Sequence, residues 1–494
     1  MWARSKRLRR IAWWRPGGSV GRAFAAALAC ILTGCAVGPE FHAPRAPAMS
    51  HYSTGDPVQT VAAQGIAQRF TTGAQVDADW WHLFKSSQLD ELIKEALANN
   101  PWLEAARASL RQSEDALRSG YGIFYPSLDA DAAATRQRYS PVGQRLPGSL
   151  FNLFTLSASV SYALDVFGGQ RRTVEALGAQ VDVQRAGEQG AYLTLIANIV
   201  NTAVAGAAYR EQIEATQQLI DLQRQQVKLA QVQVIAGTTA YSSVLSLQSQ
   251  LASLEATIPQ LEQKLSQSDD LLATLAGYAP AQWQPPHIRL ADLTLPADLP
   301  VSVPSDLVRQ RPDILAAQAT AHAASANIGV ATAALLPAVN LSGSYSANST
   351  TTDALFSTNG RAWSVGGDVT APLFQGGMLW FRRKAAVDSY QQAMASYRQT
   401  VLSAFGQVAD ILRALDHDAR ALQAQDAALA AAKEALRLVE INYEAGLNTY
   451  LDVLSADAQY HQSVINDLQA IALRYQDTVA LYVALGGGWW HLPS

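Results

Sequence analysis

Residues 229–246 read LAQVQVIAGTTAYSSVLS, and residues 438–455 read LVEINYEAGLNTYLDVLS. The two segments align at a constant offset of 209, with an Ala-Gly pair, a tyrosine and a Val-Leu-Ser run at matching positions. Such self-similarity predicts a chain built from two copies of one structural unit. Because glycine readily supplies the positive φ that ends a helix, we expect a helical hairpin in each half, turning at Gly237 and at Gly446.

Each predicted turn lies inside a long stretch without proline. Proline is absent from residues 148–258 and 373–492, and both stretches are rich in the helix formers Ala, Gln, Leu and Arg. Apolar residues recur there at spacings of three and four, which gives each helix a stripe to bury against a neighbour. A continuous helix from Gly169 to Ala236 would be about 100 Å long. The chain is therefore expected to form long paired rods.

Two segments in each half alternate between apolar residues and small or polar ones. Residues 153–167 read LFTLSASVSYALDVF, and residues 363–371 read WSVGGDVTA. Each follows a partner that begins after a proline, so we expect strand hairpins over 125–167 and 337–374. A half-buried hairpin in a soluble sheet would show the same alternation. The length, ten or more residues per strand, instead matches the tilted strands that a bilayer requires.

Four membrane strands cannot close a barrel by themselves. An open edge in hydrocarbon leaves backbone groups unpaired at several kcal/mol each, so the chain is expected to oligomerise through its strand edges. Three copies would give twelve strands around an aqueous lumen, with long helical segments below it. This geometry excludes a barrel closed from one chain, but it does not uniquely require three.

The first 35 residues have the layout of a secretory signal. A basic start precedes an apolar run over 23–32, too short to span a bilayer, and then Leu32-Thr33-Gly34-Cys35. This ending resembles the bacterial lipobox, which implies a covalent lipid on Cys35; an ordinary signal peptide with a chance cysteine is the alternative. More than one acyl chain makes anchoring stable. The residue after the cysteine, Ala36 and not Asp, implies sorting to the outer membrane.

Charge and composition exclude several classes of function. Residues 1–34 hold seven basic residues and no acid, which leaves 30 basic and 41 acidic residues in the remainder, a net charge of −11. An acidic chain without a basic stripe argues against nucleic-acid binding. The eight histidines are scattered and none stands at metal-ligand spacing with a cysteine or an acid, so we expect neither a metal site nor catalytic residues.

The sequence predicts six consecutive parts. They are a lipoprotein signal peptide (1–34), a lipidated N-terminal segment (35–85), a first structural repeat (86–278), a Pro-rich equatorial connector (279–304), a second structural repeat (305–485) and a C-terminal tail (486–494). Each repeat is expected to hold a helix, a strand hairpin and a long helical hairpin, the last over 170–275 and 377–485. Paired arginines follow the strands, and we expect Arg171-Arg172 and Arg382-Arg383 to be solvated or interfacial.

Short motifs along the mature chain resemble those of the outer membrane factor family, the TolC-like exit ducts of tripartite efflux pumps, and specifically its NodT-type lipoproteins. The resemblance covers nearly the whole mature chain. Its motifs are Asp79-Trp80-Trp81, residues 162–168 (YALDVFG), Arg311-Pro312-Asp313-Ile314, Ile328-Gly329, residues 373–377 (LFQGG), residues 450–454 (YLDVL) and residues 482–489 (YVALGGGW). Any one motif is weak, but seven in the right order are strong.

The resemblance implies a mixed α and β fold with internal duplication. The expected assembly is a trimeric 12-stranded transmembrane β-barrel, with four strands per chain, that continues into a long α-helical coiled-coil barrel in the periplasm. The expected function is passive conduction of substrates out of the cell. The expected partners are a periplasmic adaptor protein, an inner-membrane resistance-nodulation-division pump and outer-membrane lipid. Apart from the lipid on Cys35, no cofactor is implied.

Few residues acquire a role from the resemblance. The turns at Gly237 and Gly446 correspond to the family's adaptor-docking tips, although helix reversal alone requires the same glycines. Asp452 corresponds to an acidic residue that closes the periplasmic end; a solvated face residue or a local cap is the alternative. Ser455 stands where the family has a second acid, so a second acidic ring is left open.

Two other functions stay open at this level. An envelope structural coiled coil or adhesin lipoprotein without transport would explain the rods, but neither the alternating strands nor the duplication. A secreted hydrolase would need a convergent polar site, which the sequence does not show. Neither protein would conduct ions as an oligomer.

Overall fold

The computed structural model describes residues 36–55, 57–139 and 149–491, which fall into two units. Unit 1 consists of Ala116–Gly178 and His322–Gln391, with the described residues up to Phe41. Unit 2 consists of His42–Asp115, Ala179–Ala321 and the chain from Gln392 onward. The lipobox and Cys35 lie outside the described residues.

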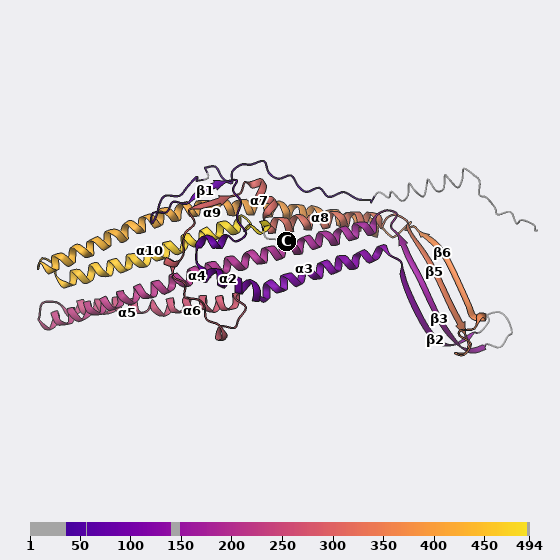
Figure 1. Ribbon diagram of the computed structural model, residues 1–494, viewed down its shortest axis with the longest axis horizontal. Coiled ribbons are helices and arrows are strands. Elements are labelled where there is room, and N and C mark those ends of the chain that lie inside the picture. Colours follow the sequence, from indigo (N-terminus) through magenta and orange to yellow (C-terminus); the bar gives the residue numbers. More distant parts are fainter. Residues whose placement is uncertain (1–35, 56, 140–148, 492–494) are drawn as a thin grey trace, which may run out of the picture. The chain divides into compact units, whose positions relative to one another are not determined.

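Unit 1 is built on one antiparallel sheet of four strands (Figure 1). The strands are β2 (Ser127–Tyr139), β3 (Ser149–Leu164), β5 (Ala338–Ser349) and β6 (Arg361–Thr370). Their order is β2-β3-β5-β6, so the hairpins of the two repeats join through β3 and β5. Strands β2 and β6 are consequently the two edges of the sheet.

The pairing register gives the sheet two chemically different faces. One row across the four strands is Leu128, Val160, Gly343 and Val365. The adjacent row is Asp129, Ser159, Ser344 and Ser364. The three pairings run without a bulge, so the alternation of each strand continues across the whole sheet. We call the face that holds Val160 the apolar face and the face that holds Ser159 the polar face.

Four long helices contribute residues to both units. They are α3 (Pro101–Gly120), α4 (Gly169–Ile235), α8 (Pro312–Ala333) and α9 (Met378–Glu444). Helices α4 and α9 each have 67 residues, as the proline-free stretches predict. Helix α4 contains a window long and apolar enough to cross a membrane, but 72% of that window is buried inside the protein, as in a core helix.

The return arms of the two helical hairpins lie in unit 2. In the second half the arm is one helix, α10 (Tyr450–Ala484), whereas in the first half it is interrupted between α5 (Tyr241–Glu255) and α6 (Ile258–Leu275). The interruption precedes Pro259, which has no backbone N–H and suits the first turn of a new helix. One proline therefore distinguishes the two otherwise similar arms.

Two helices rather than one precede each strand hairpin. Helix α2 (Ser87–Asn99) comes before α3, and α7 (Pro304–Gln310) comes before α8. Both breaks fall at a proline that begins the second helix, because the residue before a proline disfavours the helical conformation. At the first break the Asn100 side chain accepts a hydrogen bond from the Leu103 amide at 3.0 Å and donates to the Leu275 carbonyl at 2.8 Å.

The main hydrophobic core lies in unit 2. The Trp80 ring stacks on Tyr482 with centroids 5.0 Å apart, and Phe84 packs against Tyr475. The Tyr475 hydroxyl donates to the Leu293 carbonyl at 2.8 Å. The core thus joins the N-terminal segment, the connector between the repeats and the last helix.

A short parallel sheet supplements this core, although no clear sequence pattern predicts it. Strand β1 (Arg69–Thr72) pairs with β4 (Asp298–Val301), which lies in the Pro-rich connector. Phe70 and Leu299 pair in register and both are buried. Four-residue strands are too short for alternation to be recognised, so only the fold reveals them.

Candidate functional site

The polar face of the sheet carries negative charge. Among the described strand residues, the polar face holds three carboxylates and no cation; they are Asp129, Asp131 and Asp368. Serine pairs line the same face, with hydroxyl oxygens 2.8 Å apart between Ser127 and Ser161 and 2.9 Å apart between Ser344 and Ser364. The polar face is therefore suited to contact water and the apolar face to contact hydrocarbon.

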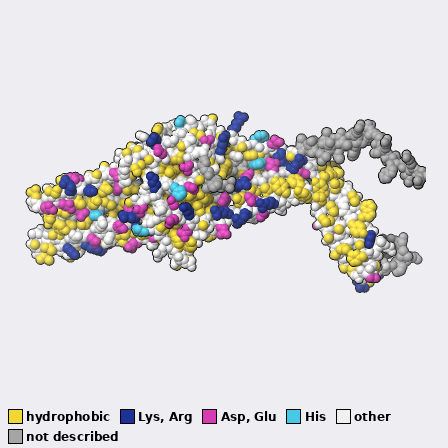
Figure 2. All heavy atoms as spheres, viewed as in Figure 1, with side chains coloured by type: hydrophobic (Ala, Val, Ile, Leu, Met, Phe, Trp, Pro, Cys, Tyr) yellow, Lys and Arg dark blue, Asp and Glu magenta, His cyan; other side chains and the backbone are white. Residues whose placement is uncertain are grey.

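The apolar face is strongly exposed in the single chain. Trp363, Val365 and Val369 on β6 are exposed at 76%, 80% and 68%. Hydrophobic side chains cover much of the visible surface of the sheet in Figure 2. Beyond the strands Phe374, Trp380 and Phe381 are exposed too, whereas Phe167 is half-buried. An apolar surface of this extent needs a partner or a bilayer.

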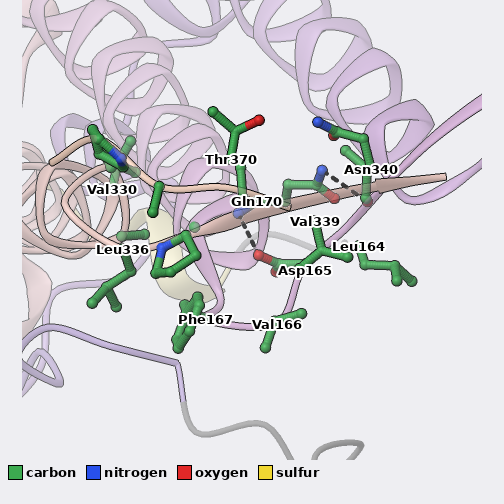
Figure 3. Close-up of a pocket in the computed structure, with 18 of the residues that line it drawn as sticks. Leu164, Asp165, Val166, Phe167, Gln170, Val330, Leu336, Val339, Asn340 and Thr370 are labelled. Atoms are coloured by element: carbon green, nitrogen blue, oxygen red, sulfur yellow. Dashed lines mark hydrogen bonds between the residues drawn. The ribbon is translucent and has the colours of Figure 1, made fainter. Parts of the chain in front are cut away.

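The junction between β3 and α4 is fixed by Asp165. Its carboxylate accepts hydrogen bonds from the backbone amides of Gln170 and Arg171, both at 3.0 Å, and from Arg171 Nε at 3.2 Å. A carboxylate at a helix N-terminus satisfies unpaired N–H groups and interacts favourably with the helix dipole. Figure 3 shows Asp165 and Gln170 in the open depression, about 920 Å³, where the strands of unit 1 meet its helices.

The first described residues are held at this same junction. The Val37 amide donates to the Phe167 carbonyl at 3.0 Å, and Arg172 Nε donates to the Val37 carbonyl at 3.2 Å. Gly38 and Gly329 approach so closely that a Cβ on Gly38 would lie 2.5 Å from the Gly329 Cα. Glycine is required there because no side chain fits.

Arg172 corrects one expectation from the sequence. It was expected to be solvated or interfacial, but it is only 6% exposed and forms an ion pair with Glu175 at 2.7 Å. Its long side chain instead binds the N-terminal segment. Arg383, in the corresponding pair of the second half, is half-buried and donates to the Thr332 hydroxyl at 3.2 Å.

The two hairpin turns have the same backbone design. Gly237 and Gly446 have φ of +73° and +74°. In each turn the glycine amide bonds three residues back and the following amide bonds five residues back, to Gln233 and Asn442. These are the paired hydrogen bonds of a Schellman helix end. Both turns lie in unit 2, at the same end of its helices (Figure 1).

Large apolar side chains are exposed around both turns. At the first turn they are Val232, Ile235, Tyr241 and Leu245. At the second they are Leu438, Ile441, Tyr443, Leu447 and Tyr450. Ile235 and Leu447 are exposed at 86% and 77%, far more than helix reversal requires. The Tyr450 hydroxyl donates to Gln225 Oε1 at 2.8 Å and so links the two hairpins.

Asp452 lies in the first turn of α10 and forms a capping box with Thr449. Asp452 Oδ2 accepts from the Thr449 amide at 2.8 Å and from its hydroxyl at 2.7 Å. These hydrogen bonds hold the pKa of Asp452 below its ordinary value, so the exposed carboxylate stays charged. The Ser455 hydroxyl donates to the Leu451 carbonyl of its own helix. The local cap that the sequence left open is therefore present.

A polar cluster that the sequence did not reveal joins α9, α10 and the N-terminal segment. The Gln64 amide donates to Asp426 Oδ2 at 2.9 Å, and Gln64 Nε2 donates to Asp467 Oδ2 at 3.4 Å. Arg474, only 2% exposed, donates to the carbonyls of Ala63 and Ile66. Carboxylates from α9 and α10 meet here. The sequence alone does not show how these two helices pair, so it does not predict the cluster.

Two carboxylates of this region have raised pKa values. Burial and the neighbouring Asp426 raise the pKa of Asp467 to about 6. Burial and a hydrogen bond with Asp418 raise the pKa of Asp477 to about 7. Asp467 and Asp477 therefore stay protonated to a higher pH than an ordinary aspartate. Within the described ranges, no group of three or more His, Cys, Asp or Glu side chains could hold a metal ion.

Comparisons with known proteins agree on one family. The family model for outer membrane efflux proteins matches residues 92–278 and 303–487. The pyoverdine export outer membrane protein OpmQ of Pseudomonas aeruginosa is 29% identical over 447 residues, which are 88% of this chain and 94% of OpmQ. The cation efflux system protein CusC of Escherichia coli is 26% identical and covers 94% of this chain and 97% of its own.

Solved channel structures share the fold. The outer-membrane channel OprN has a TM-score of 0.81 at 27% identity and covers 92% of this chain and 100% of its own. The outer membrane protein VceC of Vibrio cholerae has a TM-score of 0.74 at 28% identity and covers 84% of this chain and 100% of its own. The chain belongs to the outer membrane efflux protein family, and it is an outer-membrane exit duct of an efflux system that extends into the periplasm.

The raised pKa values of Asp467 and Asp477 predict how stability depends on pH. Between the ordinary aspartate value of 3.8 and the raised pKa values, the folded chain holds protons that the unfolded chain releases. Stability should therefore fall as pH rises from about 4 to about 7. We expect the thermal midpoint in detergent to be lower at pH 8 than at pH 5.5, and Asp467→Asn with Asp477→Asn to reduce this difference. Asp221→Asn, on an exposed surface of α4, is the matched control; an undiminished difference in the double variant would contradict the interpretation.

The register predicts opposite outcomes for neighbouring substitutions on β6. Val365→Lys places a cation on the apolar face, at a cost of about 2–4 kcal/mol near the bilayer midplane. Ser364→Lys places the same cation on the polar face, next to water and carboxylates. We expect the Val365 variant to lose most of its assembled protein in the outer membrane and the Ser364 variant to retain it, measured by quantitative blotting. Equal assembly of the two would show that the faces are assigned wrongly.

Proposed function

We propose that three copies of the chain form a closed 12-stranded transmembrane β-barrel that continues into a coiled-coil helical barrel. The open edges of β2 and β6 support this proposal most directly. Each edge carries unpaired N–H and C=O groups, which hydrocarbon cannot satisfy. With β2 of one copy paired to β6 of the next, the polar faces would enclose a lumen lined by serines and aspartates.

The lumen that this barrel encloses supports a passive, water-filled path. A charged residue at a pore wall attracts ions of opposite sign, so three aspartates per copy favour cations over anions. Similar proteins are named for pyoverdine export, toluene efflux and cation efflux. Serine and aspartate side chains on a wide wall do not select among such different substrates. We infer that the pump and the adaptor choose the substrate and that this chain supplies the path.

The turns around Gly237 and Gly446 are proposed as the surfaces that dock a periplasmic adaptor protein. This proposal is supported by the apolar side chains that are exposed around both turns. Schellman hydrogen bonds hold the backbone of each turn. An exposed apolar cluster rimmed by polar residues is typical of a protein interface. The adaptor would couple the duct to an inner-membrane pump of the resistance-nodulation-division class. An envelope coiled coil or adhesin without transport would not need the aspartate-lined face.

A lipid on Cys35 is proposed as a second attachment to the membrane. The described chain begins at Ala36, next to Gly168 at the end of the sheet where the strands meet the helices. The hydrogen bonds of Val37 hold this segment at that end, which is the periplasmic boundary of the proposed barrel.

The lipid proposal predicts the behaviour of Cys35→Ser. The variant should lose all incorporation of a radiolabelled fatty acid, because serine offers no thiol for acylation. It should still assemble, since the barrel strands hold it in the membrane. Label that persists in the variant would place the lipid elsewhere or show that the incorporation is unspecific.

Asp452 is proposed as the periplasmic gate residue. Three carboxylates that face one axis repel one another and attract cations, and the hydrogen bonds from Thr449 favour the charged form of each. Ser455, whose hydroxyl is engaged in its own helix, adds no second charged ring.

The capping box allows charge and structure to be separated in a test of this gate. Asp452→Asn removes the charge but keeps an oxygen that accepts from the Thr449 amide, whereas Asp452→Ala also removes the side-chain half of the capping box that Asp452 supplies. If the charge closes the gate, both variants should raise the closed-state conductance in planar bilayers several-fold. A rise with Ala alone would assign Asp452 to capping, and no rise with either would remove it from the gate.

Ion conduction by the purified protein tests the proposed duct itself. Wild-type protein added to a planar bilayer should produce discrete conductance steps with cations favoured over anions in a salt gradient. The combined variant Asp129→Asn, Asp131→Asn and Asp368→Asn should weaken the cation preference while the steps persist. A protein that inserts but never conducts would favour the envelope coiled coil over the duct.

A further inference from the structure

Three arginines interrupt the apolar face of the sheet at its loop end. The register pairs Arg136 with Asn152, Arg138 with Leu150 and Arg361 with Ala347. Residues at even positions of β2 and at odd positions of β6 share the face of Leu128 and Val365, so all three guanidinium groups belong to the apolar face. All three side chains are exposed.

No carboxylate on this face neutralises them. The strand residues of the apolar face that the structure describes include no Asp or Glu, because the acids of the sheet stand on the polar face. In sequence, residues 140–148 contain Arg145 and no acid, and residues 350–360 contain Asp353 alone. Arg361 donates one hydrogen bond to the Phe356 carbonyl at 3.0 Å, which leaves its other N–H groups available.

Arg136 stands far enough along β2 to reach a headgroup layer, and Arg138 stands two residues further along the same strand. Eight residues separate Leu128 from Arg136, about 27 Å along a strand and about 20 Å across a bilayer at the usual tilt. Arginine on a lipid-facing strand costs about 2–4 kcal/mol at the midplane but about 0–1 kcal/mol at the interface. Because the helices continue from the other end of the strands toward the periplasm, the loop end belongs to the outer leaflet.

All three arginines stand on the edge strands and none on β3 or β5. When copies close the sheet as proposed above, on which this inference rests, β2 of one copy adjoins β6 of the next with their loop ends on the same side. Arg136 and Arg138 of one copy and Arg361 of the adjoining copy then belong to the same, loop end of the junction. Each junction between copies would gather cations that are dispersed in the isolated chain.

We propose that Arg136, Arg138 and Arg361 form, at each junction between copies, a binding site for the phosphate groups of a phosphorylated glycolipid of the outer leaflet. The guanidinium group presents paired N–H donors that match two phosphate oxygens, and these charge-assisted hydrogen bonds are among the strongest in proteins. Binding at a junction holds two copies at once. The lipid therefore stabilises the closed barrel.

The test measures binding of bis-phosphorylated lipid A to the full-length trimer by native mass spectrometry. The combined variant Arg136→Gln, Arg138→Gln and Arg361→Gln is compared with a control that removes three exposed arginines of unit 2, Arg309→Gln, Arg398→Gln and Arg413→Gln. Wild type and control should retain up to three lipid A molecules per trimer. The sheet variant should bind roughly tenfold more weakly or worse, since several charge-assisted hydrogen bonds are lost.

Two further ligands and one further variant decide the outcome. Dephosphorylated lipid A and phosphatidylglycerol should bind wild type much more weakly than lipid A; equal binding of either would overturn the assignment to a phosphorylated glycolipid. Arg361→Gln alone, if the combined variant does not assemble, should still lower retention several-fold. Unchanged retention in an intact, conducting trimer overturns this inference only, whereas a wild-type protein that is neither trimeric nor conducting overturns the proposed function.

Discussion

The unpaired backbone groups at the edges of β2 and β6 are the constraint on which the rest of the structure depends. A four-stranded sheet with one apolar face belongs in a bilayer, but its edges cannot stay open there at several kcal/mol per unpaired group. Closure must come from other copies of the chain, since a single chain offers only four strands. The joining of β3 to β5 matters for the same reason, because it makes one continuous sheet from two repeats and leaves only two edges to satisfy.

Separate contacts hold the elements of each unit together. The Asp165 carboxylate accepts hydrogen bonds from the first backbone amides of α4. These bonds fix the turn between β3 and the helix. Arg172 and the close approach of Gly38 to Gly329 tie the N-terminal segment to the same place. In unit 2, Trp80, Tyr482 and the short β1–β4 sheet consolidate a core around the helices. The charges on the sheet are sorted by the same register, with acids on the polar face and arginines on the apolar one.

Much of this fold could be predicted from the sequence because it is periodic and duplicated. Strand alternation, proline-free stretches and the repeated turns at Gly237 and Gly446 each report a local geometry. Other features depend on which elements meet in space, so no local sequence pattern predicts them. The pKa of Asp467 is raised beside Asp426 only because α9 and α10 pair in one register. The paired arginines predicted a solvated or interfacial Arg172, which the N-terminal segment in fact buries. Asp452 shows both cases. Its capping box with Thr449 is local and could be foreseen from the sequence, whereas its proposed role in the gate requires three chains.

The mass of the detergent-solubilised mature protein tests the central claim most directly. Light scattering with the detergent contribution subtracted measures the protein mass alone. Closure of the sheet by three copies predicts a mass of three chains, stable on dilution. A stable monomer would leave the edges of β2 and β6 unpaired and would contradict the shared barrel.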